Sequence, residues 1–182
     1  MLPIRIAHFE RTHVTGFDIH GLRIGQGMDV HAFAPDRKLI IGGVEIPHHQ
    51  GLDGHSDADV LTHAIMDALL GAARAGDIGK LFPPDDPAYE GADSIELLLH
   101  VADYVRSLGF EIVDVDSVIA AQAPKLSPHR DQMCQNLAAA MGISIENVGV
   151  KATTTEHLGF EGREEGISAT ATCLLARCSN DR

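Results

Sequence analysis

Apolar and β-branched residues alternate with polar residues in several short segments of the chain. This period of two places the apolar side chains on one face of an extended segment, so it predicts strands. The first two segments are joined through Pro35-Asp36, and the second ends at Pro47. The predicted strands cover residues 22–30, 38–46, 110–121, 148–152 and 167–175.

Between these segments, apolar residues recur every three or four positions, which is the spacing of one helix face. Ser56 is a favourable N-cap, and Asp93 and Glu96 have capping-box spacing. The predicted helices run from Ser56 to about residue 75, from Asp93-Ser94 to Gly109, and from Ser127-Pro128 to Gly142. Strands and helices therefore alternate, which predicts an α+β fold, or α/β layer, with helices packed on a mixed β-sheet.

Length and composition fit one globular domain, because 182 residues of which 45% are apolar can bury a sizeable core. The net charge of −12 argues against nucleic acid or a membrane as a partner, since both attract a basic protein face. Cys134, Cys173 and Cys178 are odd in number and lack metal-site spacing, which favours a reducing cytoplasm. We expect no signal peptide and no membrane span, because no apolar run is long enough.

Histidines and carboxylates are concentrated between Asp29 and His63. Asp29 and His31 stand two positions apart in a predicted strand, so their side chains point to the same face. His63 lies on the next predicted helix and can supply a third ligand. Two imidazoles and one carboxylate form the ligand set of a catalytic zinc, which keeps a fourth position open. The pattern therefore predicts a zinc site that carries out chemistry.

Other interpretations of these residues stay open. An Asp-x-His pair is often only a hydrogen-bonded surface pair. Asp59, His63 and Asp67 recur every four residues and form one polar stripe on the helix. This stripe either faces solvent or holds a metal through His63, with Asp67 orienting the imidazole. A second pair, Asp18-x-His20, lies in the N-terminal segment without a partner element, so we interpret it as a coincidence.

Long strings of residues occur in this order along the chain: RIGQGMDVH, IIGGVEIP, GHSDADVLTHAIMDALLGAARAGDIGKLFP, AQAPKL and VKATTTEHLGFEGR. Together they closely resemble the 2-C-methyl-D-erythritol 2,4-cyclodiphosphate synthase family over residues 23–176. Members of this family usually start just before the RIG string. The resemblance implies one synthase-like domain at residues 23–178, a poorly ordered N-terminal extension at residues 1–22 and a C-terminal tail at residues 179–182.

The resemblance implies an enzyme of non-mevalonate isoprenoid-precursor synthesis, which is formally a phosphorus-oxygen lyase. Members convert 4-diphosphocytidyl-2-C-methyl-D-erythritol 2-phosphate to 2-C-methyl-D-erythritol 2,4-cyclodiphosphate and release CMP. The 2-phosphate of the substrate is the nucleophile, so no serine or cysteine nucleophile is required. The resemblance also implies a homotrimer with sites between adjacent subunits. Helices would pack on one face of each sheet, and the sheets would face the threefold axis.

Position by position, the resemblance implies zinc ligands at Asp29, His31 and His63, in agreement with the spacing. It implies a second divalent cation, Mg²⁺ or Mn²⁺, at Glu156. Transition-state stabilisers are implied at His55 and Thr154. Residues 121–127 and 152–156 would hold the cytidine diphosphate from the neighbouring subunit. The implied substrate-binding residues are Asp29, His31, His55, Ser56, Asp77, Ile78, Gly79, Phe82, Asp85, Asp86, Ala121, Pro124, Lys125, Leu126, Ser127, Ala152, Thr153, Thr154, Thr155, Glu156, Phe160 and Arg163.

The chain departs from the family pattern at two positions. Glu164 stands where members commonly have a glycine, and Pro84 stands where an aspartate is common. In the family, Phe160 and Arg163 correspond to residues that line a cavity at the trimer axis, which can hold an isoprenoid phosphate. The added carboxylate at Glu164 weighs against such binding. Without the resemblance, Arg163 is more typical of a surface ion pair than of a phosphate ligand.

Two other functions fit the predicted metal site. A zinc-dependent phosphoester hydrolase would use the open coordination position to activate water. The chain lacks the His-Glu-x-x-His string of one large class of zinc hydrolases. A non-catalytic metal-binding or assembly protein would turn over no substrate. The synthase would release CMP with a cyclic product, the hydrolase would form a linear product, and the binding protein would form neither.

Overall fold

The computed structural model of the protein describes residues 21–83, 86 and 89–178. The expectations for the N-terminal extension up to His20, for Asp85 and for the tail at residues 179–182 concern residues outside these ranges. The Asp18-x-His20 pair lies outside them as well. Within the described ranges, strands and helices alternate and form a mixed sheet with helices, as the sequence predicts.

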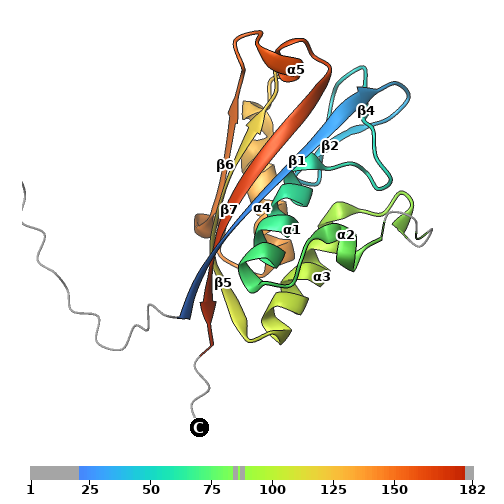
Figure 1. The fold of residues 1–182 in the computed structure, drawn as a ribbon. Coiled ribbons are helices and arrows are strands. Elements are labelled where there is room, and N and C mark those ends of the chain that lie inside the picture. Colours follow the sequence, from blue (N-terminus) through green and yellow to red (C-terminus); the bar gives the residue numbers. More distant parts are fainter. Residues whose placement is uncertain (1–20, 84–85, 87–88, 179–182) are drawn as a thin grey trace, which may run out of the picture.

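A five-stranded sheet with the order β4-β1-β7-β5-β6 forms the centre of the fold (Figure 1). The long strands β1 (Leu22–Ala34), β7 (Gly166–Arg177) and β5 (Phe110–Ala120) pair antiparallel, with β7 in the middle. β6 (Val148–Thr153) pairs parallel with β5, and β4 (Gly51–Leu52) pairs antiparallel with β1. Among the four longer strands, β1 and β6 therefore lie on opposite sides, with β7 and β5 between them.

The predicted strand at residues 38–46 is wrong, because this segment is a hairpin. Its two strands, β2 (Leu39–Ile41) and β3 (Val44–Ile46), form a separate two-stranded sheet. Gly42 and Gly43 make the turn with φ values of 58° and 67°. Glycine adopts this left-handed region without the steric cost of a Cβ, and two such residues in sequence form the turn that suits a tight hairpin.

The helices α1 (Val60–Ala73), α3 (Ser94–Ser107) and α4 (Arg130–Met141) lie on one face of the sheet (Figure 1). The third predicted helix starts later than expected, because Ser127-Pro128 opens a short 3-10 turn before α4. Shorter helical segments are α2 (Ile78–Leu81), α5 (Gly159–Gly162), and 3-10 turns at Ser127–His129 and Ile145–Asn147. No helix in the described part of the chain has the length and apolarity needed to cross a membrane.

The first helix starts at Val60 with Asp59 as its N-cap, so the prediction of Ser56 as the cap is wrong. The Asp59 carboxylate is fully buried and accepts hydrogen bonds from the backbone N–H of Thr62, the Thr62 hydroxyl and the backbone N–H of Gly43. It therefore caps α1 and ties the hairpin to it. Three donors satisfy this buried carboxylate, and Ser56 offers only one hydroxyl.

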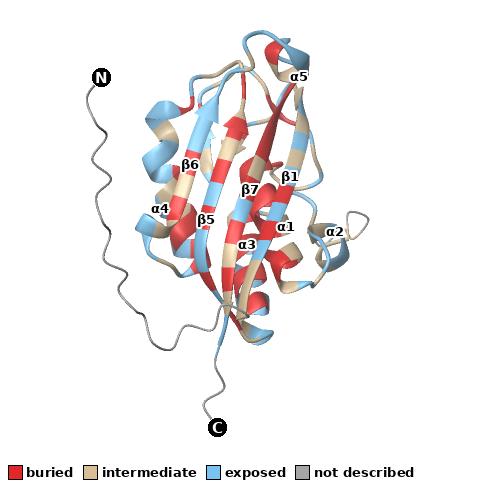
Figure 2. Ribbon diagram, turned by 60° about the vertical axis from the view of Figure 1, so that its left-hand side comes forward, coloured by how far each residue is buried: buried red, intermediate tan, exposed pale blue. Residues whose placement is uncertain are grey.

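Strand β1 shows different residues on the two faces of the sheet. Gly25 and Gly27 face the helices and are buried. On the other face, the side chains of Ile24, Met28 and Val30 are 68%, 61% and 43% exposed, and the sheet surface there alternates between exposed and buried residues (Figure 2). A row of exposed apolar side chains on a sheet is typical of a surface that a partner chain covers.

Candidate functional site

Two glycines of β1 bring helix α1 into direct contact with the strand. A Cβ atom on Gly25 would lie 1.9 Å from the carbonyl oxygen of Ala68, and one on Gly27 would lie 2.1 Å from that of Ala64. Both distances are impossible for a side chain, so this close packing requires glycine. Asp29 continues the same face of the strand by the period of two. The strand and helix therefore meet where ligands from both can converge.

We expect Gly27→Ala to weaken both the fold and the metal centre, because its Cβ would clash with backbone atoms of α1. The free energy of unfolding should fall by about 1–3 kcal/mol, as for other overpacked cores, and the affinity for metal should fall with it. The matched control is Gly71→Ala on the same helix, where the nearest atom would lie 4.0 Å away. Urea unfolding and metal titration of both variants test this; equal behaviour would contradict the close-contact argument.

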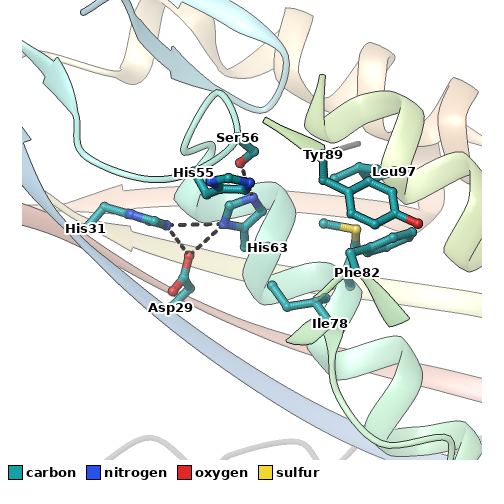
Figure 3. Close-up of a pocket in the computed structure, with 10 residues that line it drawn as sticks. Asp29, His31, His55, Ser56, His63, Ile78, Phe82, Tyr89 and Leu97 are labelled. Atoms are coloured by element: carbon teal, nitrogen blue, oxygen red, sulfur yellow. Dashed lines mark hydrogen bonds and ion pairs between the residues drawn. The ribbon is translucent and has the colours of Figure 1, made fainter. Parts of the chain in front are cut away.

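The side chains of Asp29, His31 and His63 converge at one point (Figure 3). Oδ2 of Asp29 lies 2.9 Å from Nε2 of His31 and 3.0 Å from Nδ1 of His63, and the two nitrogens lie 3.2 Å apart. These three residues are the group in the described part of the chain whose side chains could hold a metal ion together. Two imidazole nitrogens and a carboxylate oxygen fit a divalent ion such as zinc, with a position left for a further ligand.

The charges at this point favour a cation. Burial tends to raise the pKa of Asp29, but hydrogen bonds and attraction from His31 and His63 outweigh it and hold the pKa well below its usual value. Burial tends to lower the pKa of His31, but its contact with Asp29 leaves the pKa above the usual value. Asp29 is therefore ionised at neutral pH, as a metal ligand must be.

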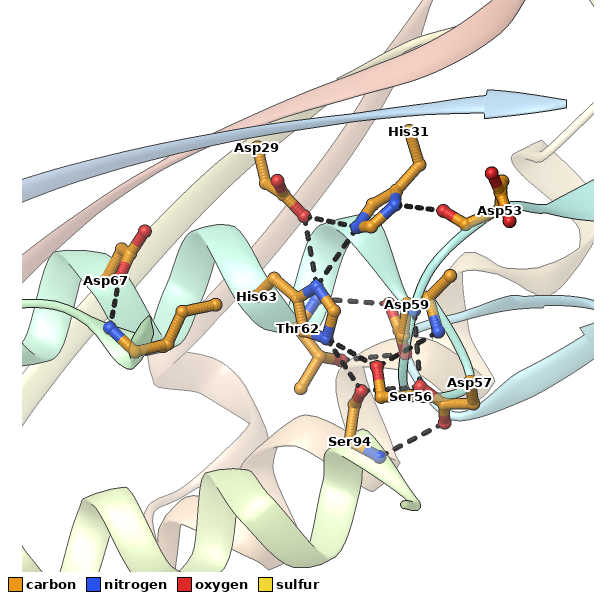
Figure 4. Close-up of polar contacts among 12 residues, drawn as sticks. Asp29, His31, Asp53, Ser56, Asp57, Asp59, Thr62, His63, Asp67 and Ser94 are labelled. Carbon is orange, nitrogen blue, oxygen red and sulfur yellow. Dashed lines mark hydrogen bonds and ion pairs between the residues drawn. The ribbon is translucent and has the colours of Figure 1, made fainter. Parts of the chain in front are cut away.

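The other nitrogen of each imidazole has a partner of its own (Figure 4). Nδ1 of His31 donates to the carbonyl oxygen of Asp53, which leaves Nε2 for the metal. Nε2 of His63 lies 3.0 Å from Oγ of Ser94 and 3.2 Å from Oγ of Ser56. Such partners fix the orientation and the tautomer of a ligating histidine.

The prediction that Asp67 orients His63 is wrong. The carboxylate of Asp67 accepts a hydrogen bond from the backbone N–H of Ile78 at 2.8 Å and so anchors the start of α2. Burial raises the pKa of Asp67. Asp67 is one helical turn beyond His63, and at that distance along the helix it faces α2. The three polar residues of this stripe therefore have different roles: Asp59 caps α1, His63 is a candidate metal ligand, and Asp67 anchors the start of α2.

The three candidate metal ligands line one side of a pocket of about 250 Å³ (Figure 3). Arg37 holds the loop at one wall by donating to the carbonyl oxygens of Gly54 and Ser56, at 2.8 and 2.6 Å. The predicted site residues in the pocket lining are Asp29, His31, His55, Ser56, His63, Ile78 and Phe82. Sequence reasoning missed Met66, Tyr89 and Leu97, whose apolar character resembles that of ordinary core residues.

Three further predicted residues lie beside this pocket. Asp77 caps α2 by accepting the backbone N–H of Lys80, and Gly79 is exposed in the same helix. The carbonyl oxygen of Asp86 lies 3.4 Å from Nε2 of His55. The prediction for Asp85 falls outside the described residues. The region expected to contact the erythritol part of the substrate thus borders the metal-ligating residues.

A second pocket, of about 260 Å³, collects most of the residues predicted to hold the nucleotide. Thr154 donates to a carboxylate oxygen of Glu156 at 2.6 Å just beside it. The predicted residues in the lining of this pocket are Ala121, Pro124, Lys125, Leu126, Ser127, Ala152, Thr153 and Thr154. Thr155 is adjacent in sequence and binds the carbonyl oxygen of Leu158 through its hydroxyl. Among the described residues, none lines both pockets.

Phe160 lies in α5 and Arg163 directly follows it. Neither residue lines either pocket. The guanidinium of Arg163 donates to both carboxylate oxygens of Glu165, at 2.8 and 2.9 Å. This is the exposed ion pair that the residues alone suggest. Glu164 has a φ of 57°, a left-handed conformation that a glycine would adopt at lower cost.

Comparisons with known proteins give one consistent result. The family model described as the YgbB family matches residues 22–176. The 2-C-methyl-D-erythritol 2,4-cyclodiphosphate synthase of Geotalea uraniireducens is 57% identical over 156 residues, which cover 86% of this chain and 99% of the relative. The synthase of Moorella thermoacetica is 56% identical over 154 residues, which cover 85% of this chain and 94% of the relative.

Solved structures share the fold as well. The IspF of Plasmodium falciparum, solved as a CDP complex, is 32% identical with a TM-score of 0.77, covering 89% of this chain and 100% of that one. The bifunctional IspDF of Campylobacter jejuni is 44% identical with a TM-score of 0.83, covering 86% of this chain and 42% of that one. Together with the family match, these similarities show that the chain belongs to the YgbB family, the family of the cyclodiphosphate synthases that its motifs resemble.

Proposed function

We propose that the protein converts 4-diphosphocytidyl-2-C-methyl-D-erythritol 2-phosphate to 2-C-methyl-D-erythritol 2,4-cyclodiphosphate with release of CMP. The observation that carries this proposal is the convergence of Asp29, His31 and His63 in one pocket with His55 and Ser56. The relatives named as this synthase match almost their whole length. An oxygen of the 2-phosphate would bond to the β-phosphorus, and the bond from the β-phosphorus to the bridging oxygen would break, with CMP keeping the electron pair.

The substrate brings its own nucleophile, so the protein has to fold a flexible anion back on itself and neutralise its charge. We assign Asp29, His31 and His63 as zinc ligands. When bound, zinc supplies Lewis-acid polarisation of a phosphate oxygen. His55 and Ser56 lie beside the triad at the pocket surface, where an imidazole and a hydroxyl can donate to the phosphates.

We further propose that each complete site forms between two subunits of a homotrimer. The metal centre lies at β1 and the nucleotide pocket at the ends of β5 and β6, so β7 lies between them in the sheet. The two strand spacings from β1 to β5 and the three from β1 to β6 amount to about 10 and 14 Å of sheet. A neighbouring copy could instead bring its nucleotide pocket directly against the metal centre. The exposed row of Ile24, Met28 and Val30 supports such an assembly through the open face of the sheet.

Glu156 is our candidate ligand for a second divalent cation, Mg²⁺ or Mn²⁺. It is exposed and lies outside the triad of its own chain, where it accepts the hydroxyl of Thr154. A cation at this position could bind both the Glu156 carboxylate and the substrate diphosphate, because carboxylate and phosphate oxygens are the ligands that both ions prefer. Lys125 and the bound cations would offset the charge of the substrate in a protein whose net charge is −12.

Turnover of the cytidine-linked substrate tests the proposed function. Purified protein with Zn²⁺ and Mg²⁺ should release CMP and form the cyclic diphosphate in equal amounts, as measured by chromatography and phosphorus NMR. A linear product would favour a zinc-dependent hydrolase, and metal binding without turnover would favour a binding protein. We place this activity in the cytoplasm, in accord with three cysteines that are all free.

We expect that deleting residues 1–20 leaves both turnover and assembly unchanged. The family match begins at residue 22, and terminal segments outside a matched domain are usually dispensable. The rate of CMP release should stay within about twofold of the full-length protein. Size-exclusion chromatography with light scattering would compare the assemblies. A truncated protein that no longer assembles would show that the extension packs on a neighbouring subunit.

A further inference from the structure

Ser94 is fully buried at the start of α3, yet its hydroxyl belongs to the surroundings of the metal centre. Its Oγ donates to Oδ1 of Asp57 at 2.5 Å, and its backbone N–H donates to Oδ2 of the same carboxylate at 3.1 Å. The hydroxyl has one proton, which points to Asp57, so Oγ can only accept from Nε2 of His63 at 3.0 Å. The direction of the hydrogen bonds is therefore determined by Asp57.

We propose that Asp57 and Ser94 are positioning residues that orient His63 as a metal ligand. The chain of bonds runs from Nε2–H of His63 to Oγ of Ser94 and from the Ser94 hydroxyl to Asp57 (Figure 4). It keeps the proton on Nε2 and leaves Nδ1 directed at Asp29 and His31. The inference rests on the zinc site of the proposed function and adds two residues that do not touch the metal.

The position of this chain of bonds explains why it can hold the ring in place. His63 is 8% exposed and Ser94 is fully buried, so water does not readily compete for the bond between them. Asp57 also accepts the backbone N–H of Asp59, which fixes its carboxylate against the N-terminus of α1. Helices α1 and α3 are thereby joined through the ligand. Ser56, at 3.2 Å from Nε2 of His63, borders the pocket and is the weaker candidate for this role.

Zinc affinity of Ser94→Ala tests the proposal, with Ser117→Ala as the matched control. Ser117 is also buried, and its hydroxyl donates to the carbonyl oxygen of Gly149, remote from the metal centre. We expect Ser94→Ala to weaken zinc binding about 10- to 100-fold in competition with a chromophoric chelator. Ser117→Ala should bind zinc like the wild type. Equal zinc affinity of the two variants would overturn the proposal.

Two further measurements keep the test decisive if Ser94→Ala does not fold. Asp57 is partly exposed, so Asp57→Asn should fold, and it should weaken zinc binding about 10-fold. In the zinc-loaded wild type, nitrogen-edited NMR should show a slowly exchanging Nε2–H proton on His63. A rapidly exchanging proton, or unchanged affinity in Asp57→Asn, would overturn the inference. A wild type that binds no zinc would instead refute the metal assignment of the proposed function.

Discussion

His63→Ala is expected to remove bound zinc and nearly all turnover while the chain remains folded. The variant loses one of the three proposed ligands, the one that α1 contributes. Loss of Lewis-acid stabilisation worth several kcal/mol corresponds to a decrease in rate of about 10³-fold. The fold should persist because the buried face of α1, with Leu61, Ile65 and Leu69, is unchanged.

Metal analysis and CMP release would be measured on the same preparations of His63→Ala. His20→Ala is the sequence control, since it alters the other Asp-x-His pair, and it should change neither zinc content nor rate. Stoichiometric zinc in His63→Ala would refute the ligand assignment. Loss of zinc in His20→Ala would show instead that the N-terminal pair is the ligand pair. Circular dichroism would confirm that both variants keep their helices.

The three candidate ligands could be found in the sequence because the placement of each depends on local geometry. Asp29 and His31 share a face by the alternation of a strand, whatever the rest of the fold does. The position of His63 on a helix follows from the apolar periodicity around it. What the periodicity does not reveal is the contact between β1 and α1. That contact depends on Gly25 and Gly27, which in sequence are only two small residues.

The surroundings of the ligands could not be predicted, because they depend on how distant segments dock. Ser94 follows His63 by 31 residues and Asp57 by 37, and only the packing of α3 on α1 brings them together. Asp67 is the opposite case. Its spacing of four residues from His63 suggested contact, but the same spacing places it where the N-terminus of α2 arrives.

Two errors in the predicted elements have a simpler cause. Gly42-Gly43 between β-branched residues is a hairpin signal that competes with the reading of one continuous strand, and the turn prevails. Ser56 and Asp59 are both residues that cap helices well. The choice between them depends on Gly43, because its backbone N–H needs a buried acceptor and the Asp59 carboxylate supplies it. The capping preferences of Ser56 and Asp59 alone do not take this distant N–H donor into account.

Mixing two inactive variants is expected to restore activity if sites form between subunits. His63→Ala lacks the metal half of the site, and Thr154→Ala lacks a hydroxyl in the nucleotide half, where loss of one donor costs about 10²–10³ in rate. In randomly mixed trimers, an intact metal half meets an intact nucleotide half at about one interface in four. Refolding the two variants together should therefore give about a quarter of wild-type CMP release.

The measured fraction distinguishes the two possible arrangements of the site. If metal centre and nucleotide pocket of one chain acted together, every site in a mixed trimer would carry one defect and activity would stay at the level of the parents. The structure favours the other arrangement, because β7 lies between the strands that carry the two pockets. Mass spectrometry of intact trimers must confirm mixed composition. Confirmed mixed trimers without activity would refute the shared site, and the zinc assignment through His63 would be unaffected.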